Sequence, residues 1–125
     1  MLPRFLVHED VRREDGTSVP LEVGSVQQID LKLVITQTRE QESLVVSLEG
    51  SPDGVEWEKR PLFAFPQKFY CGTYTRSIDL SQHPEVRYLR ARWTMNSWSR
   101  TDARPSFAFY LRAEFAEVAA MAASV

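Results

Sequence analysis

The sequence predicts an all-β fold: a two-layer antiparallel β-sandwich of the jelly-roll type, with seven to eight strands. Apolar and polar residues alternate along several segments, which is the pattern of strands with one buried face. Turn sequences separate these segments at intervals of roughly 10 to 15 residues. The seven Phe, four Tyr and three Trp suit a core between two sheets. We find no amphipathic helical pattern before residue 115.

The clearest turn is the Ser-Pro-Asp-Gly sequence at residues 51–54. Pro52 fixes φ at the first central position of a turn, and Gly54 can adopt the positive φ of a bulge. This chemistry predicts an antiparallel hairpin whose two strands are residues 44–51 and 55–60.

Other strand patterns flank this hairpin. Residues 4–8 form a short strand, and residues 19–23 are expected to pair back onto it as an edge, since Pro20 cannot donate to a ladder. Residues 39–43 read as a polar turn. Further strands are expected at 26–38, 62–65 (an edge), 70–80, 86–96 and 106–115. The residues expected to face the core in the longest of these are Ile29, Leu31, Leu33, Ile35, Leu89, Ala91, Trp93, Met95, Phe107, Phe109, Leu111, Ala113 and Phe115.

Length and charge limit the classes of function. The 125 residues suit one domain, 1–125, in which residues 116–125 are a short helix or a loose tail. The net charge of −2 gives no general attraction to polyanions, so we expect neither nucleic acid nor a membrane surface as a partner. The basic residues are twelve Arg and only three Lys, which reflects either GC-rich coding sequence or a contact surface built on Arg.

Cys71 is the single cysteine, so an internal disulfide is ruled out; this fits either a reducing compartment or a fold whose core is large enough to need no disulfide. We expect this thiol to be buried and inert. The first residues lack a signal-peptide pattern, and no apolar run reaches about 18 residues. These features predict a cytoplasmic protein, with a virion or phage-like particle as the alternative location.

Two runs within about residues 44–95 resemble a known family: Val46-x-Leu48-Glu49-Gly50-Ser51-x-Asp53-Gly54-x-x-Trp57 and Arg87-Tyr88-Leu89-Arg90-x-x-Trp93. The resemblance is to discoidin-like (coagulation factor 5/8 type C) domains, and it implies a galactose-binding-like jelly roll in which Asp53 and Gly54 form a turn and Trp57 covers the end of the core. Similar S-x-D-G-x-x-W hairpins occur in bacteriophage structural proteins. The family's early Trp and its disulfide have no counterpart here.

Catalytic and metal-binding patterns are weak. His8, Glu9 and Asp10 are consecutive, and consecutive strand residues point to opposite faces, so they would not converge on one ion. His83 precedes a proline in a turn. No nucleophile elbow or phosphate-binding loop is visible. The sequence therefore predicts neither an enzyme, nor a metal site, nor a cofactor.

The candidate contact residues lie on the last two strands and on the loop between them. Tyr88, Arg90 and Arg92 share one face of their strand, and Tyr110 and Arg112 share one face of the next. If these strands pair directly, their arginines cluster into an Arg/Tyr contact surface for another subunit. If the strands lie in different sheets, as sequential strands of a jelly roll do, the cluster dissolves.

The loop after residue 96 adds Trp98 and Arg100 to the candidates. The Trp98 ring either stacks on a sugar or fills a neighbour's pocket, or it folds back as a lid on the core.

Taken together, these patterns predict a non-catalytic structural or protein-interaction module. It is expected to assemble with protein subunits, either copies of itself or a larger complex of phage-like type. The alternative is a carbohydrate-binding module of the discoidin-like type, in which Trp98 contacts the sugar.

Overall fold

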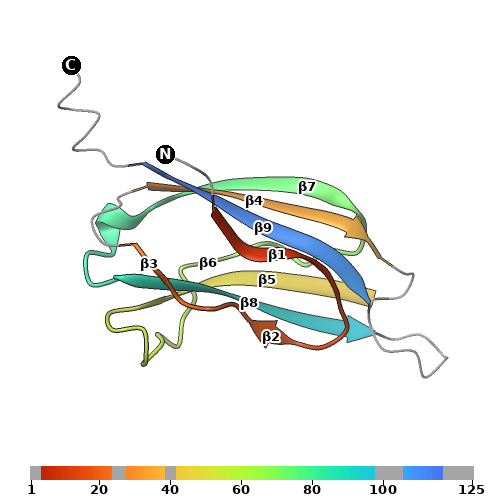
Figure 1. The fold of residues 1–125 in the computed structure, drawn as a ribbon, viewed down its shortest axis with the longest axis horizontal. Coiled ribbons are helices and arrows are strands. Elements are labelled where there is room, and N and C mark those ends of the chain that lie inside the picture. The colour runs from red at the N-terminus through yellow and green to blue at the C-terminus, as the bar shows by residue number, and fades with distance from the viewer. Residues whose placement is uncertain (1–3, 24–27, 39–41, 98–105, 117–125) are drawn as a thin grey trace, which may run out of the picture.

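The computed structural model describes residues 4–23, 28–38, 42–97 and 106–116. Over these residues the chain forms two antiparallel sheets packed face to face, which confirms the predicted β-sandwich (Figure 1). Beyond Ala116, the predicted tail lies outside the described residues. The strands are β1 (Arg4–Arg12), β2 (Gly16–Thr17), β3 (Leu21–Glu22), β4 (Gln28–Gln37), β5 (Glu42–Ser51), β6 (Phe63–Ala64), β7 (Gly72–Asp79), β8 (Tyr88–Ser97) and β9 (Phe107–Ala116), with a 3₁₀ turn at Leu80–Gln82.

The strand order is that of a jelly roll. Sheet A has the order β1-β9-β4-β7, and sheet B has the order β2-β8-β5-β6, with β3 also paired to β8. The first strand therefore lies beside the last, and the second beside the one before it, as two nested Greek keys require. β2 and β3 together occupy the position of one strand, so the prediction of seven to eight strands holds.

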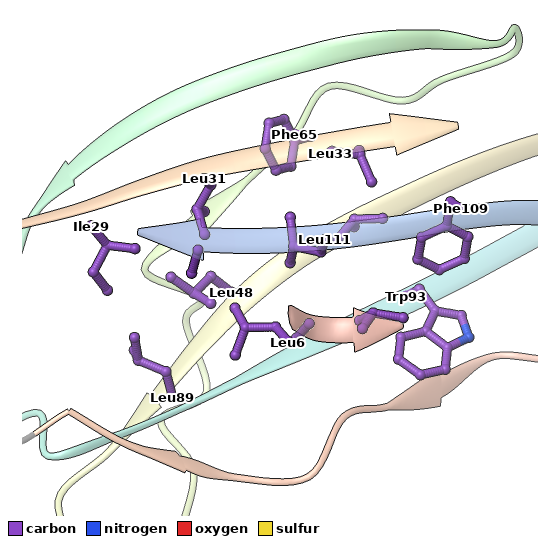
Figure 2. Packing of buried hydrophobic residues seen from close by; sticks show 14 of the residues in the cluster. Leu6, Ile29, Leu31, Leu33, Leu48, Phe65, Leu89, Trp93, Phe109 and Leu111 are labelled. Carbon is purple, nitrogen blue, oxygen red and sulfur yellow. The ribbon is translucent and has the colours of Figure 1, made fainter. Parts of the chain in front are cut away.

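The core lies between the two inner faces. In β4 and β9 every second residue is buried, as the alternation predicts, and β5 and β8 supply the opposing layer (Figure 2). Burial of these side chains from water is the main favourable term in folding. All thirteen residues expected to face inward do so, twelve of them buried and Met95 partly buried.

The hairpin prediction is right about the turn and wrong about the returning strand. Gly54 has φ of 79°, the positive value expected of it. Residues 55–60, however, form no strand, and β5 pairs instead with β6, which begins at Phe63. The reason is that side chains of the turn accept the N–H groups of residues 53–56, so these amides cannot pair with β5.

The first third of the chain also departs from the prediction. Residues 19–23 do form an edge, but β2 and β3 pair with β8 in sheet B rather than with β1 in sheet A. The segment is held there because Trp93 Nε1 donates to the carbonyl of Glu14 at 3.0 Å and the Met95 N–H donates to Asp15 at 2.7 Å. Gly16 lies against the Trp93 ring, where an added Cβ would come within 2.6 Å.

Two other predictions are corrected by burial. Cys71 is exposed, because it lies in the connection that crosses from sheet B to β7, outside the alternating segment. The predicted polar turn at 39–43 is partly strand: Glu42 and Ser43 begin β5 and are buried, while residues 39–41 fall outside the described part. Glu42 accepts the N–H of Ser106 and the hydroxyl of Thr38, so its carboxylate joins three segments.

Candidate interaction surface

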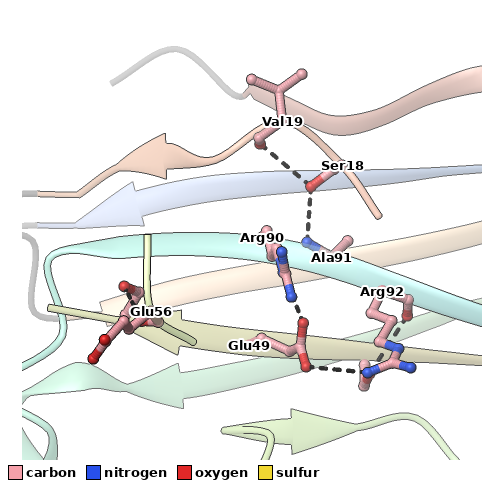
Figure 3. A network of polar contacts seen from close by, with 9 residues as sticks. Ser18, Val19, Glu49, Glu56, Arg90, Ala91 and Arg92 are labelled. Carbon is pink, nitrogen blue, oxygen red and sulfur yellow. Dashed lines mark hydrogen bonds and ion pairs between the residues drawn. The ribbon is translucent and has the colours of Figure 1, made fainter. Parts of the chain in front are cut away.

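The outer face of sheet B carries a charged cluster centred on a buried carboxylate. Glu49 on β5 lies directly opposite Arg90 on β8, and both side chains point away from the core. Arg90 Nε donates to Glu49 Oε1 at 2.8 Å, and Arg92 Nη1 lies 3.8 Å from Oε2 (Figure 3). Glu49 is only 6% exposed although it faces outward, because the two arginine side chains cover it. The carboxylate thus fixes the Arg90 guanidinium and forms a longer ion pair with the guanidinium of Arg92.

Trp57 belongs to this cluster and not to the core. The guanidinium carbon of Arg90 lies 4.3 Å from the centre of the Trp57 ring, a cation–π contact. The expectation that Trp57 covers the end of the core is therefore wrong. Because residues 55–60 leave the ladder, the loop carries Trp57 onto the outer face, over β8. We call Glu49, Trp57, Tyr88, Arg90 and Arg92 the arginine surface.

The turn that carries Trp57 is fixed by its own side chains. Ser51 is fully buried; its hydroxyl donates to the Glu56 carbonyl and accepts the Gly54 N–H at 2.8 Å. The N–H groups of Glu56 and Val55 donate to the Asp53 carboxylate and lower its pKa below the ordinary 3.8. An added Cβ on Gly54 would lie 3.3 Å from the Tyr88 ring, so the turn packs directly against the arginine surface.

The end of the surface away from Trp57 is hollowed. A shallow depression of about 360 Å³ is lined by Arg90, Arg92 and residues 15–17 of the β2 segment. The Arg92 side chain is 55% exposed, which is more than twice the exposure of Arg90. Arg92 therefore has donors available to a partner, while Arg90 is held between Glu49 and Trp57.

The other two candidate residues in the described part lie on the opposite side of the molecule. Tyr110 and Arg112 belong to β9 in sheet A, whereas β8 belongs to sheet B. The single Arg cluster does not form, and of the two arrangements left open by the sequence the structure has the second. Tyr110 packs edge-on against Phe5, and Arg112 lies 3.9 Å from Glu114. Trp98 and Arg100 lie outside the described residues.

His8 lies on β1, and His83 lies at the end of the 3₁₀ turn. His8 stacks on Phe5, and His83 lies 3.9 Å from Glu85 at the surface. Within the described ranges no three His, Cys, Asp or Glu side chains are grouped so as to hold a metal ion. None of the helical turns described is long and apolar enough to cross a membrane.

In comparisons with known proteins, the chain is similar to solved structures alone. No family model matches the chain, including any of discoidin-like type, and no curated protein matches its sequence. Among solved structures it is similar to the SPBc2 prophage-derived protein YomS, with 8% identity, a TM-score of 0.48 and coverage of 91% of this chain and 96% of that one. Similarity at this level assigns no function.

The sequence contained a signal for the arginine surface that the alternation alone does not use. Glu49 faces outward in its strand beside a conspicuous turn, and Arg90 does the same in the best-defined later strand. Only the β5–β8 register, in which Glu49 is opposite Arg90, connects the two. The contribution of Trp57 could not be found this way, because it depends on where the loop leaves the ladder.

Proposed function

We propose that this chain is a non-catalytic protein-interaction module that assembles with itself or with a larger complex through the arginine surface. The observation that carries the proposal is the buried Glu49 carboxylate, which fixes Arg90 on an outer strand face and lies within ion-pair distance of the more exposed Arg92. A surface whose side chains are already held in place loses less conformational entropy on binding.

The chemistry of the surface favours a protein partner with exposed carboxylate or carbonyl groups. Arg92 offers planar donors that match a carboxylate, and Trp57 and Tyr88 add aromatic area next to it. Arg, Trp and Tyr are the residues that most often dominate binding energy at protein interfaces. Because Glu49 neutralises part of the positive charge, the surface suits a protein better than a polyanion.

Site-specific photo-crosslinking in the source cells tests the proposal. A photoreactive side chain in place of Thr94, which is exposed on the outer face of β8, should give one discrete adduct. The matched control is the same side chain in place of Val34 on the outer face of sheet A. Arg92→Ala should reduce the Thr94 adduct severalfold. Equal adducts at both positions, or an adduct that ignores Arg92→Ala, would contradict the proposal.

Two narrower hypotheses extend this one. Membership of a phage-like particle is supported by the S-x-D-G-x-x-W resemblance, and tail or capsid genes beside this gene would favour it. Carbohydrate binding is supported by the discoidin-like resemblance and by Trp98. A glycan array should then show binding that Trp98→Ala abolishes, and a blank array would remove that hypothesis. Trp57 is a poor sugar platform, because Arg90 covers one face of its ring.

A further inference from the structure

The free edges of the two sheets are not equivalent. Most are poor templates for another strand: β2, β3 and β6 have two residues each, and β1 has two register shifts against β9. β7 differs, because its eight residues pair with β4 without interruption, from Gln28 opposite Asp79 to Ile35 opposite Gly72. No described strand pairs with its other side. Proteins usually shorten, kink or cover such an edge.

We propose that the β7 edge is a second interaction surface, and that its partner is β7 of another copy of this chain. The proposal rests on the assembly function above and names one partner and one geometry for it. Two copies would pair antiparallel about a two-fold axis and join their A sheets into one continuous sheet of eight strands.

The sequence of β7 favours one register for this pairing. Residues directly opposite each other must share a face. The two-fold axis therefore passes midway between two copies of the same residue, one from each chain. With Thr75 on the axis, seven residues of each strand pair, and Tyr74 lies opposite Arg76 of the other copy. No like charges then face each other. Moving the axis to Arg76 also pairs seven residues but places Arg76 opposite its own copy, which is destabilising.

The cations near this edge are turned back onto their own chain. The Arg76 guanidinium carbon lies 5.2 Å from the Phe63 ring centre, and Lys68 Nζ lies 3.8 Å from the Tyr74 ring centre. Both contacts bridge β7 to the β6 side of sheet B, so these charges point across the sandwich rather than out from the edge. This arrangement removes the usual electrostatic protection of an edge strand.

Exposed aromatic side chains lie beside the same edge. Phe69 and Tyr70, in the connection just before β7, are 39% and 76% exposed, and their rings lie 6.4 Å apart. In the register with Thr75 on the axis they extend past the end of the partner's β7, where they can bury apolar area against the second copy. They supplement the backbone hydrogen bonds of an edge that by itself buries little surface.

Charge variants at the axis test the pairing. Light scattering across a concentration series should show the mass rising from the monomer's 14.4 kDa toward twice that value. Thr75→Lys and Thr75→Glu are exposed changes that should each give a folded monomer at every concentration, because two like charges would face each other. An equimolar mixture of the two should dimerise again. A strictly monomeric parent, or variants that dimerise as the parent does, would overturn the proposal.

Crosslinking tests the register independently. In a Cys71→Ser background, Thr75→Cys places the two thiols opposite each other, within disulfide reach, and should oxidise to a covalent dimer. The matched control, Thr73→Cys in the same background, separates the thiols by roughly 13 Å along the strands and should not. Equal crosslinking of both variants would refute the register.

The two proposals fail separately. If the parent stays monomeric and Thr75→Cys gives no covalent dimer while the Thr94 adduct persists and depends on Arg92, the edge pairing is wrong and the arginine surface stands. If the cysteine dimer forms while the Thr94 adduct is absent, the chain assembles through β7 and the arginine surface is wrong.

Discussion

The outer faces of the two sheets carry similar residues, but the cross-strand neighbours of their arginines differ. In sheet B, Arg90 of the Tyr88-x-Arg90 pattern lies opposite Glu49, which it contacts at 2.8 Å. In sheet A, Arg112 of the Tyr110-x-Arg112 pattern lies opposite Lys32 on one side and Phe5 on the other. It forms an ion pair with Glu114 of its own strand, at 3.9 Å.

The difference shows that the cross-strand neighbour decides what an outward arginine does. In sheet A like charges lie opposite each other: Asp30 is opposite Glu114, and Lys32 is opposite Arg112. Attraction between unlike charges there can act only along a strand or diagonally between strands. Sheet B sets unlike charges opposite each other and buries the carboxylate between them. The outer face of sheet A is therefore solvated, whereas in sheet B the Arg90 side chain is held in one position.

Replacing the two carboxylates should give the largest difference between the sheets. Glu49→Gln leaves Arg90 and Arg92 without their counter-charge and should lower the free energy of unfolding by about 2 kcal/mol. Glu114→Gln should change it by less than about 0.5 kcal/mol, because that pair is exposed and long. Urea denaturation measures both. Equal losses would remove the distinction.

Replacing the arginines by lysine tests geometry rather than charge. Arg90→Lys keeps the charge but loses the planar group over Trp57 and the directed Nε bond, and should cost about 1 kcal/mol. Arg112→Lys should be close to neutral. A neutral Arg90→Lys, measured in the same urea titrations, would mean that charge alone holds the surface.

Exchanging two charges on β4 should give the outer face of sheet A the charge pattern of sheet B, with unlike charges opposite each other. The double variant Asp30→Lys with Lys32→Asp keeps the composition and sets unlike charges opposite both Glu114 and Arg112. Stability should rise by roughly 0.5 kcal/mol at low salt, and the gain should shrink at high salt. A loss at low salt would show that the Ser77 hydrogen bond to Asp30 outweighs the charge pattern.

The smallest effect concerns pH and the turn beneath the arginine surface. The pKa of Asp53 is lower in the folded chain than its ordinary 3.8, so its contribution to stability is full above that value and is lost as pH falls through the folded pKa. Asp53→Asn removes the contribution. The gap in unfolding free energy between the parent and this variant should therefore close on acidification; a gap that widens would reverse the assigned sign.

The sequence predicted which side of each strand is buried, but it did not predict which residues lie opposite each other on neighbouring strands. Strict alternation identified the buried residues of β4, β8 and β9, because a period of two leaves no freedom once one face is apolar. The loop that carries Trp57 escaped prediction, since the Ser51 and Asp53 side chains compete with the ladder for its amides. The pairing of Glu49 with Arg90 escaped for a different reason: register between strands 41 residues apart is set by the whole core, not by either segment.

A double-mutant cycle on Glu49 and Arg90 is the most direct test of the fixed surface, with Arg112 and Glu114 as the reference pair. Unfolding free energies of the single and double alanine variants give the coupling of each pair. A coupling above about 1 kcal/mol for Glu49 with Arg90, and below about 0.5 kcal/mol for Arg112 with Glu114, is the expected result. Equal couplings would show that the buried carboxylate fixes nothing.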